Sequence, residues 1–152
     1  MIRVQVEAFD VGVEFAKLKQ GRTDIGGPVL FVGTVRELSD GAQVSTMTLE
    51  HYPGMTEKAL EEIDQEAHRR WPLLDTLVVH RYGRLSPADD IVLVITTSDH
   101  REAAFEACHF LIDWLKTKAP FWKLEEGPQG GGWVEAKTSD DKSAARWDKK
   151  SS

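Results

Sequence analysis

The sequence has little cysteine and no long hydrophobic run. Its one cysteine, Cys108, cannot form a disulfide within the chain of 152 residues. No apolar run approaches the roughly 18 residues that a membrane-spanning helix needs. The first residues also lack the basic, apolar and small-residue order of a signal peptide. We therefore expect a cytoplasmic protein without a membrane segment.

Basic residues are fewer than acidic ones. The chain has 19 Lys and Arg and 25 Asp and Glu, which gives a net charge of −6. This balance argues against general affinity for nucleic acid or for an anionic membrane. Any anion site must then be built locally. The histidines and Cys108 show no zinc-ligand spacing, so we expect no metal site. The histidines are His51, His68, His80, His100 and His109.

Hydrophobic periodicity predicts an α+β protein, with a mixed, largely antiparallel sheet and three main helices. Helices are predicted at 10–21, 55–71 and 102–118, and strands at 2–6, 28–35, 44–52, 76–82, 91–98, 121–125 and 133–136. The apolar run 28–35 is typical of a central strand that is covered on both faces. We expect 1–137 to form one domain, and 138–152 to be a polar tail in which Trp147 can dock.

The segment around Pro120 is the sharpest local feature. Lys116 follows Ile112 by four residues, so its ammonium lies at the edge of a buried helical stripe. Beyond the proline, strand alternation puts Phe121 and Lys123 on one face. The two lysines are thus predicted to converge as a nucleophile, a proton donor or a stabiliser of an oxyanion. The alternative is a helix end whose basic residues complement its dipole.

A second group of polar residues, 98–101, lies between a predicted strand and the third helix. The backbone amides of the helix start, with His100 and Arg101, form a plausible phosphate site. The alternative, compatible with the first, is that Ser98 or Asp99 caps the helix. Arg36 ends the strand 28–35, a place where ligands often bind, although a single arginine there is usually a surface residue.

Five segments together resemble the MoaE family. They are FVGTVR (31–36), LEHYPGM (49–55), HRYG (80–83), DHREAAF (99–105) and LKTKAPFWK (115–123). The similarity runs in order as far as 133–135 and covers most of the chain.

The resemblance implies an α/β hammerhead fold and a homodimer within a heterotetramer. A small ubiquitin-like sulfur-carrier subunit binds at each end, and its C-terminal Gly-Gly thiocarboxylate enters a pocket of the large subunit. There it donates sulfur to cyclic pyranopterin monophosphate, and two transfers build the dithiolene of molybdopterin. The implied activity is that of a sulfurtransferase that uses neither a metal nor an organic cofactor.

The resemblance also implies roles for single residues. Lys116 and Lys123 match the catalytic lysines of the family. The positions that match substrate-binding residues are Thr34, Val35, Arg36, His100, Arg101, Leu124, Glu125 and Lys137. Thr34 stands where some members have lysine, and Lys137 matches a basic residue that closes the pocket of the neighbouring subunit. The sequence leaves open another function, a dimeric module that binds a phosphometabolite or nucleotide without catalysis.

Overall fold

The protein is represented by a computed structural model, which describes residues 1–39, 42–43, 46–127, 130–134 and 145–148. The helices are α1 (Val11–Lys19), α2 (Met55–Arg70) and α3 (Arg101–Thr117). The strands are β1 (Ile2–Gln5), β2 (Gly27–Thr34), β3 (Leu38–Ser39), β4 (Ala42–Gln43), β5 (Thr46–His51), β6 (Thr76–Arg81), β7 (Gly83–Leu85), β8 (Asp90–Ser98), β9 (Phe121–Gly127) and β10 (Gly130–Val134). This content confirms the predicted α+β class with three main helices.

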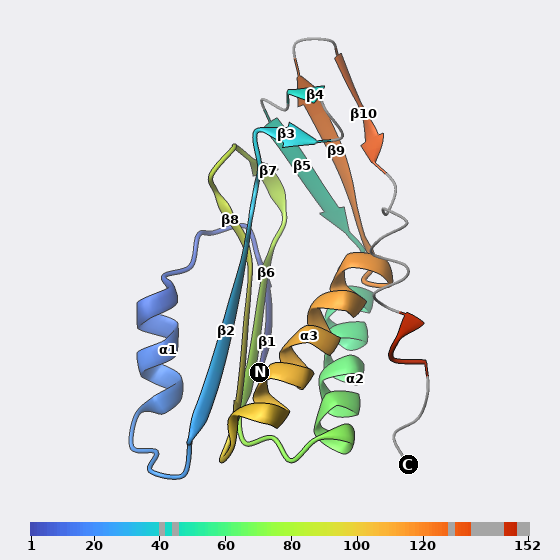
Figure 1. Ribbon diagram of the computed structural model, residues 1–152. Coiled ribbons are helices and arrows are strands. Elements are labelled where there is room, and N and C mark those ends of the chain that lie inside the picture. The colour runs from blue at the N-terminus through green and yellow to red at the C-terminus, as the bar shows by residue number, and fades with distance from the viewer. Residues whose placement is uncertain (40–41, 44–45, 128–129, 135–144, 149–152) are drawn as a thin grey trace.

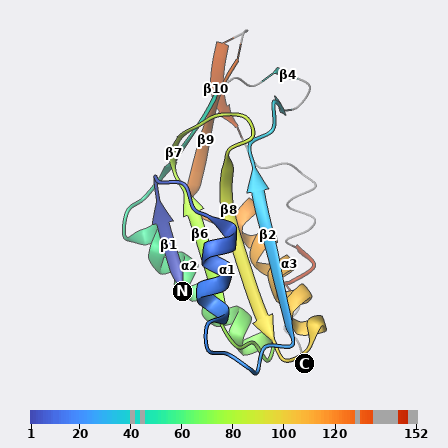
Figure 2. The same ribbon diagram turned by 90° about the vertical axis from the view of Figure 1, so that its left-hand side faces the viewer.

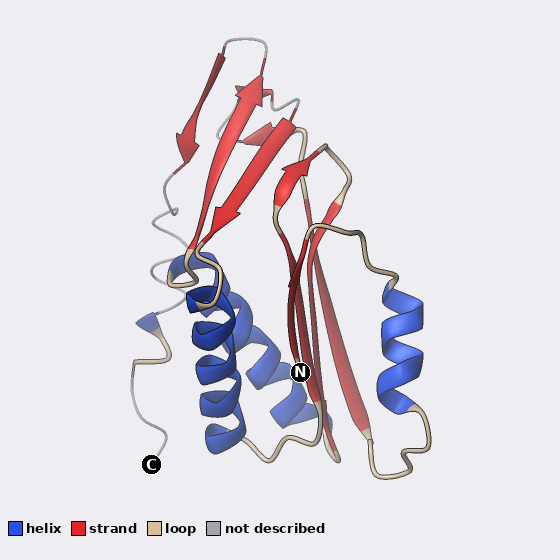
Figure 3. Ribbon diagram, turned by 180° about the vertical axis from the view of Figure 1, so that it is seen from behind, coloured by secondary structure: helices blue, strands red, loops and turns tan. Residues whose placement is uncertain are grey.

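The strands divide between two four-stranded sheets and a short β3–β4 pair. The first sheet has the order β1-β6-β8-β2, in which β1 and β6 are parallel and the other pairs antiparallel. Helix α1 covers one face of this sheet, and α2 and α3 cover the other (Figures 1 and 3). The strands predicted at 76–82 and 91–98 are thus found as the antiparallel pair β6 and β8.

Strand alternation divides the first sheet into two cores. One core faces α1 and contains Leu77, Val79, Leu93 and Ile95, with Leu30, Val32, Val11, Phe15 and Leu18 packed against it. The other faces α2 and α3 and contains Val78, Val92, Val94, Ala67, Cys108, Phe110 and Leu111. Cys108 is thus a core residue, and burial raises the pKa of its thiol to about 11.

Strand β2 differs from its prediction in one respect. It is covered on both faces, because Leu30 and Val32 pack toward α1 while Val29 and Phe31 pack toward α3. It is nevertheless an edge strand of the first sheet, paired with β8 on one side (Figure 2). The predicted central position was wrong because an apolar run reports coverage of the two faces, which the helices supply, and not the number of paired neighbours.

The second sheet has the order β10-β9-β5-β7 and is antiparallel throughout. In Figure 1 it stands above the ends of α2 and α3, to which β5 and β9 are directly joined in the chain. A smaller core, made of Val35, Met47, Leu49 and Leu85, lies between this sheet and the end of β2.

Two boundaries in this region differ from the predictions. The segment 37–43, expected to be a loop, contains β3 and β4. The strand expected at 133–136 begins earlier, at Gly130, and pairs with β9. Glycine has no side chain to alternate between faces, so the period-two signal of a strand is absent from Gly130 to Gly132.

The helix ends largely follow the sequence signals. The Asp10 carboxylate accepts a hydrogen bond from the Val13 amide at 2.9 Å, and Gly21 takes a left-handed φ of +71° after α1. The predicted cap of α3 was wrong, because His100 is the N-cap residue and its side chain makes no cap hydrogen bond. The Ser98 hydroxyl instead donates to the Pro72 carbonyl at 2.9 Å.

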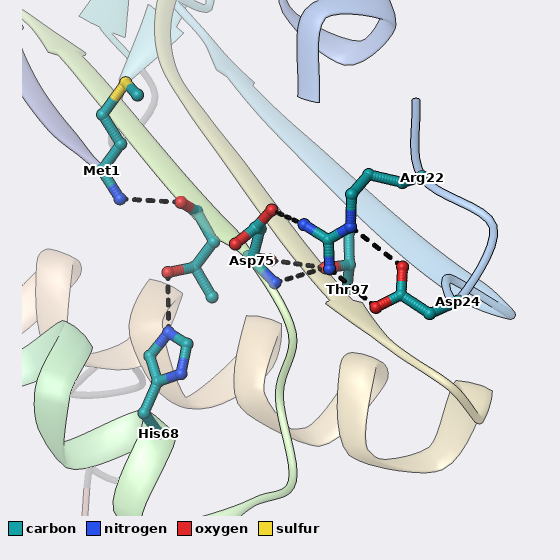
Figure 4. Close-up of polar contacts among 7 residues, drawn as sticks. Met1, Arg22, Asp24, His68, Asp75 and Thr97 are labelled. Atoms are coloured by element: carbon teal, nitrogen blue, oxygen red, sulfur yellow. Dashed lines mark hydrogen bonds and ion pairs between the residues drawn. The ribbon is translucent and has the colours of Figure 1, made fainter. Parts of the chain in front are cut away.

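A polar network fixes the lower end of the first sheet (Figure 4). Arg22 donates two 2.9 Å hydrogen bonds to the Asp24 carboxylate and also pairs with Asp75. Asp75 is tied to β8, since its amide donates to the Thr97 hydroxyl at 2.8 Å and its carbonyl accepts from that hydroxyl at 2.6 Å. The loop after α1 is therefore held against the β6–β8 pair.

Helix α2 is tied to β6 in the same region. The Thr76 hydroxyl donates to the Asp64 carboxylate at 2.6 Å, so its oxygen accepts the 3.0 Å hydrogen bond from His68 Nε2. The Met1 ammonium donates to the Thr76 carbonyl at 2.8 Å (Figure 4). These contacts pin the start of β6.

Trp147 docks on the helices, as predicted. Its indole N–H donates to the buried Asp113 carboxylate at 2.7 Å, and its ring makes edge contacts with Trp71 and Phe110. The predicted domain boundary between 137 and 138 lies outside the described residues. Within the part of the chain that is described, no helix is both long and apolar enough to cross a bilayer.

The start of β2 approaches α3 so closely that only glycine fits there. A methyl group on Gly27 would lie 2.8 Å from the Arg101 Cα and 2.9 Å from the Arg101 nitrogen, which are backbone atoms. We expect Gly27→Ala to lower the free energy of unfolding by about 2 kcal/mol in urea titrations. The matched control is Gly12→Ala in α1, where the methyl group has room and stability should be unchanged or rise by up to ~1 kcal/mol. Equal stabilities of the two variants would contradict this account.

His80 gives the fold a pH dependence. It is 8% exposed, and burial, helped by the nearby Lys116 and His51, lowers its pKa from 6.5 to about 4. The unfolded chain therefore binds a proton more readily, so stability is complete above about pH 6.5 and is lost as the pH falls toward 4. Between pH 7 and pH 5 we expect a loss of about 2 kcal/mol from this residue. In urea titrations, the free energy of unfolding of His80→Phe should fall by about 2 kcal/mol less than that of the wild type between pH 7 and pH 5. An identical pH dependence in both proteins would refute this prediction.

Candidate active site

The two predicted catalytic lysines lie on either side of the turn 118–120. Lys116 is exposed in the last turn of α3, and Lys123 is the third residue of β9 and half-buried. The turn is tight, because the Lys118 amide donates to the Trp114 carbonyl at 2.8 Å and the Phe121 amide to the Ala119 carbonyl at 2.7 Å. The chain thus passes directly from the helix layer into the second sheet.

Lys123 faces the small core of the second sheet. It is paired directly with Leu49 of β5, and directly opposed residues of an antiparallel pair have their side chains on the same face. Leu49 packs in one cluster with Val35, so the end of β2 lies against the face that carries Lys123. Hydrogen bonds of 2.8–2.9 Å between Val35 and the residues Ala88 and Asp89 fix this end of β2.

The predicted residues next to Val35 are open to ligands. Thr34 and Arg36 are both exposed, on either side of buried Val35, and a register shift between Gly33 and Thr34 ends the regular pairing of β2. Because Val35 packs with Leu49, the residue opposite Lys123, the backbone at Arg36 borders the small core that Lys123 faces.

The remaining predicted residues of β9 divide between its faces. Leu124 is half-buried and, by alternation, lies on the face opposite to Lys123. Glu125 follows in the same strand, where it pairs with Met47 and Gly132. Lys137 lies outside the described residues.

His100 and Arg101 are not brought to the lysines within one chain. They stand exposed at the first turn of α3, whereas Lys116 is in its last turn. Fifteen residues of helix, at about 1.5 Å each, separate Arg101 from Lys116 by about 22 Å. One small ligand cannot contact both ends of α3 in the same protomer.

A cluster of four rings beside Lys116 was missed by the sequence analysis. We call His51, His80, Tyr82 and Phe121 the ring cluster. The His80 and Phe121 rings stack with centroids 3.8 Å apart, and the His51 and Tyr82 rings meet edge to face at 4.4 Å. The spacing of the histidines along the chain bears only on metal binding. The usable signal was that both occur in segments shared with the MoaE family, close to the ends of predicted strands.

A surface hollow of about 310 Å³ lies on the helix side, between α2, α3 and the docked Trp147. Its described lining residues include Arg70, Trp114 and Lys118, and none of the predicted site residues. Lys118 pairs there with Asp148 at 3.9 Å. Lys118 therefore points away from the lysine pair. Within the described ranges, no group of three or more His, Cys, Asp or Glu side chains is arranged to hold a metal ion.

Comparison with known proteins assigns the chain to a family. The family model described as MoaE protein matches residues 4–118. A relative from Ralstonia nicotianae, named molybdopterin synthase catalytic subunit, is 55% identical over 146 residues, which are 96% of this chain and 83% of that protein.

Two solved structures are similar over nearly the whole chain. A molybdopterin biosynthesis MoaE protein from Burkholderia ambifaria has a TM-score of 0.82 and 53% identity, with 97% of both chains covered. Molybdopterin synthase from Staphylococcus aureus has a TM-score of 0.79 and 32% identity, with 87% of this chain and 95% of that chain covered. By sequence and by structure, this chain belongs to the MoaE family.

Proposed function

We propose that this chain is the catalytic subunit of a molybdopterin synthase. It transfers sulfur from the C-terminal thiocarboxylate of a small ubiquitin-like carrier protein to cyclic pyranopterin monophosphate, and two transfers form the dithiolene. The observation that carries the proposal is the 55% identity, over 96% of this chain, to a relative with that name. The arrangement of lysines around the turn 118–120 supports it.

The partner follows from the same name, because a catalytic subunit implies a second, different subunit. We propose a homodimer with one carrier at each end, a heterotetramer. The carrier supplies its sulfur already activated as a thiocarboxylate, so we expect the transfer to need no metal and no organic cofactor. We also place the protein in the cytoplasm, in keeping with its single, buried thiol, Cys108.

In this proposal Lys116 and Lys123 carry the chemistry. The thiocarboxylate sulfur forms a bond to a pterin carbon, which releases an oxygen substituent in exchange, so that carrier and pterin are joined as a thioester. Water then attacks the acyl carbon and the bond from that carbon to sulfur breaks, which leaves a carboxylate on the carrier and the sulfur on the pterin. Negative charge develops on the acyl oxygen, and an ammonium group held beside it stabilises that charge. We assign this role to Lys116 and assign orientation or protonation of the pterin to Lys123, and the two roles are interchangeable in our scheme.

The phosphate and the pterin are proposed to bind to the exposed cations. Val35 packs in the small core that Lys123 faces, and the exposed residues Thr34 and Arg36 flank it in the chain. His100 and Arg101 lie about 22 Å from Lys116 along α3. If they also bind the substrate, they must do so in the site of the partner protomer. Leu124, Glu125 and Lys137 complete the proposed binding residues.

The lysine assignment predicts a large loss of activity in Lys116→Ala. Removing one group that stabilises an oxyanion typically costs about 100-fold or more in rate. The test mixes the purified chain with thiocarboxylated carrier and cyclic pyranopterin monophosphate and measures the dithiolene product in a single turnover. Lys118→Ala, which removes an exposed lysine two residues away, is the control and should react within about twofold of wild type.

A normal product yield from folded Lys116→Ala would refute the catalytic assignment. Absence of product from the unmodified chain would instead favour a binding module without catalysis.

The proposal that two protomers share a site predicts complementation. Lys116→Ala and Arg101→Ala homodimers should each be inactive. After random mixing, each heterodimer has one site that combines an intact Lys116 with an intact Arg101 of the other protomer, so about a quarter of all sites recover. If both residues act within one protomer, mixing restores nothing. The measurement is product yield against the ratio of the two variants, after subunit exchange has been checked by mass spectrometry.

A further inference from the structure

The ring cluster lies where the two sheets and α3 meet. His51 is the last residue of β5, His80 belongs to β6, and Phe121 is the first residue of β9. Phe121 is stacked on His80 with an interplanar angle of 16°, and it is paired in register with His51 at a centroid distance of 5.8 Å. One phenylalanine is thus held by a ring from each sheet.

Hydrogen bonds fix the orientation of both imidazoles. His80 Nδ1 donates to the Arg81 carbonyl at 2.8 Å, because a carbonyl oxygen can only accept. The single hydroxyl hydrogen of Thr56 is donated to the Tyr52 carbonyl at 2.8 Å, so His51 Nδ1 is the donor to the Thr56 oxygen at 3.0 Å. Neither ring can flip without losing a hydrogen bond, so the cluster is a rigid support.

Phe121 couples this support to the lysines. It is the first residue after the turn 118–120, and its side chain lies on the same face of β9 as that of Lys123. Movement of the Phe121 ring would tilt the start of β9 relative to α3 and change the position of Lys123 relative to Lys116. Lys116 is itself close enough to His80 for its positive charge to lower the pKa of the imidazole, with burial as the larger cause. His80 is thus neutral at pH 7 and places no second positive charge beside Lys116.

We propose that His80 and Phe121 are positioning residues for sulfur transfer, which hold the turn 118–120 so that Lys116 and Lys123 keep their productive separation. The inference rests on the proposed function, in which these lysines carry the transfer. Small displacements of reacting groups are costly in rate, with about 1 Å capable of costing ~100-fold. A loss of the stacking contact should therefore lower the rate of the chemical step more than the binding of the carrier.

The test uses two replacements of His80 that separate its ring from its hydrogen bond. His80→Asn retains an N–H donor near the Arg81 carbonyl but removes the ring from Phe121. His80→Phe retains a ring for stacking but removes the donor. In single turnovers at saturating carrier and cyclic pyranopterin monophosphate, we expect His80→Asn to be at least about tenfold slower than wild type. We expect His80→Phe to recover the rate to within about threefold, and both variants to bind the carrier with a Kd within about threefold of wild type.

Phe121→Leu removes the same contact from the other side and serves if His80→Asn does not fold. It should be as slow as His80→Asn, and the double variant should be no slower than either, because one interaction is lost only once. The control is His68→Asn, which breaks the hydrogen bond to Thr76 at the far end of β6. It should lower the melting temperature and leave the rate unchanged.

Rates of His80→Asn and Phe121→Leu within twofold of wild type would overturn the inference. So would a rate loss that follows the melting temperature across all variants, His68→Asn included, since this would mean a purely structural role. Lys116→Ala is measured in parallel. Full activity in that variant means that the proposed function fails, whereas a slow Lys116→Ala beside fast cluster variants means that only the positioning role fails.

Discussion

Helix α3 buries Ala104, Ala107 and Leu111 against the first sheet, and this contact fixes where both of its ends lie. At one end the helix starts against β2, where Gly27 leaves room for Arg101. At the other end it delivers Lys116 to the foot of the second sheet. The length of one helix therefore keeps two groups of cations about 22 Å apart in a protomer. A site that uses both groups has to be shared between protomers.

The charges of the site act against an acidic background. With a net charge of −6, the chain as a whole repels anions, and both proposed ligands, a phosphorylated pterin and a carboxylate-ended tail, are anionic. Selectivity therefore depends on a few cations at the ends of elements, such as Arg36 after β2 and Lys116 in α3. Their separation is set by backbone packing, which makes the turn 118–120 and the ring cluster beside it more important than their small size suggests.

The absence of charge on His80 at pH 7 also limits the positive charge around Lys116. An imidazolium buried next to Lys116 would destabilise the fold and raise the local positive charge, and burial prevents this by lowering the pKa of His80 to about 4. A neutral ring supplies a stacking surface and a hydrogen-bond donor at no electrostatic cost. His80 thus contributes the stacking surface and the N–H of its neutral ring, and no charge.

The sequence by itself determined the helices, most strand positions and the importance of the lysine segment, because these depend on local periodicity and on short motifs. Only the tertiary structure decided that β2 is an edge strand, that the strands form two sheets and that Arg101 lies far from Lys116 in one chain. It also brought His51, His80 and Phe121 together from three strands. These ring contacts join residues 41 and 70 positions apart, and no local pattern encodes which strand will become the neighbour of another.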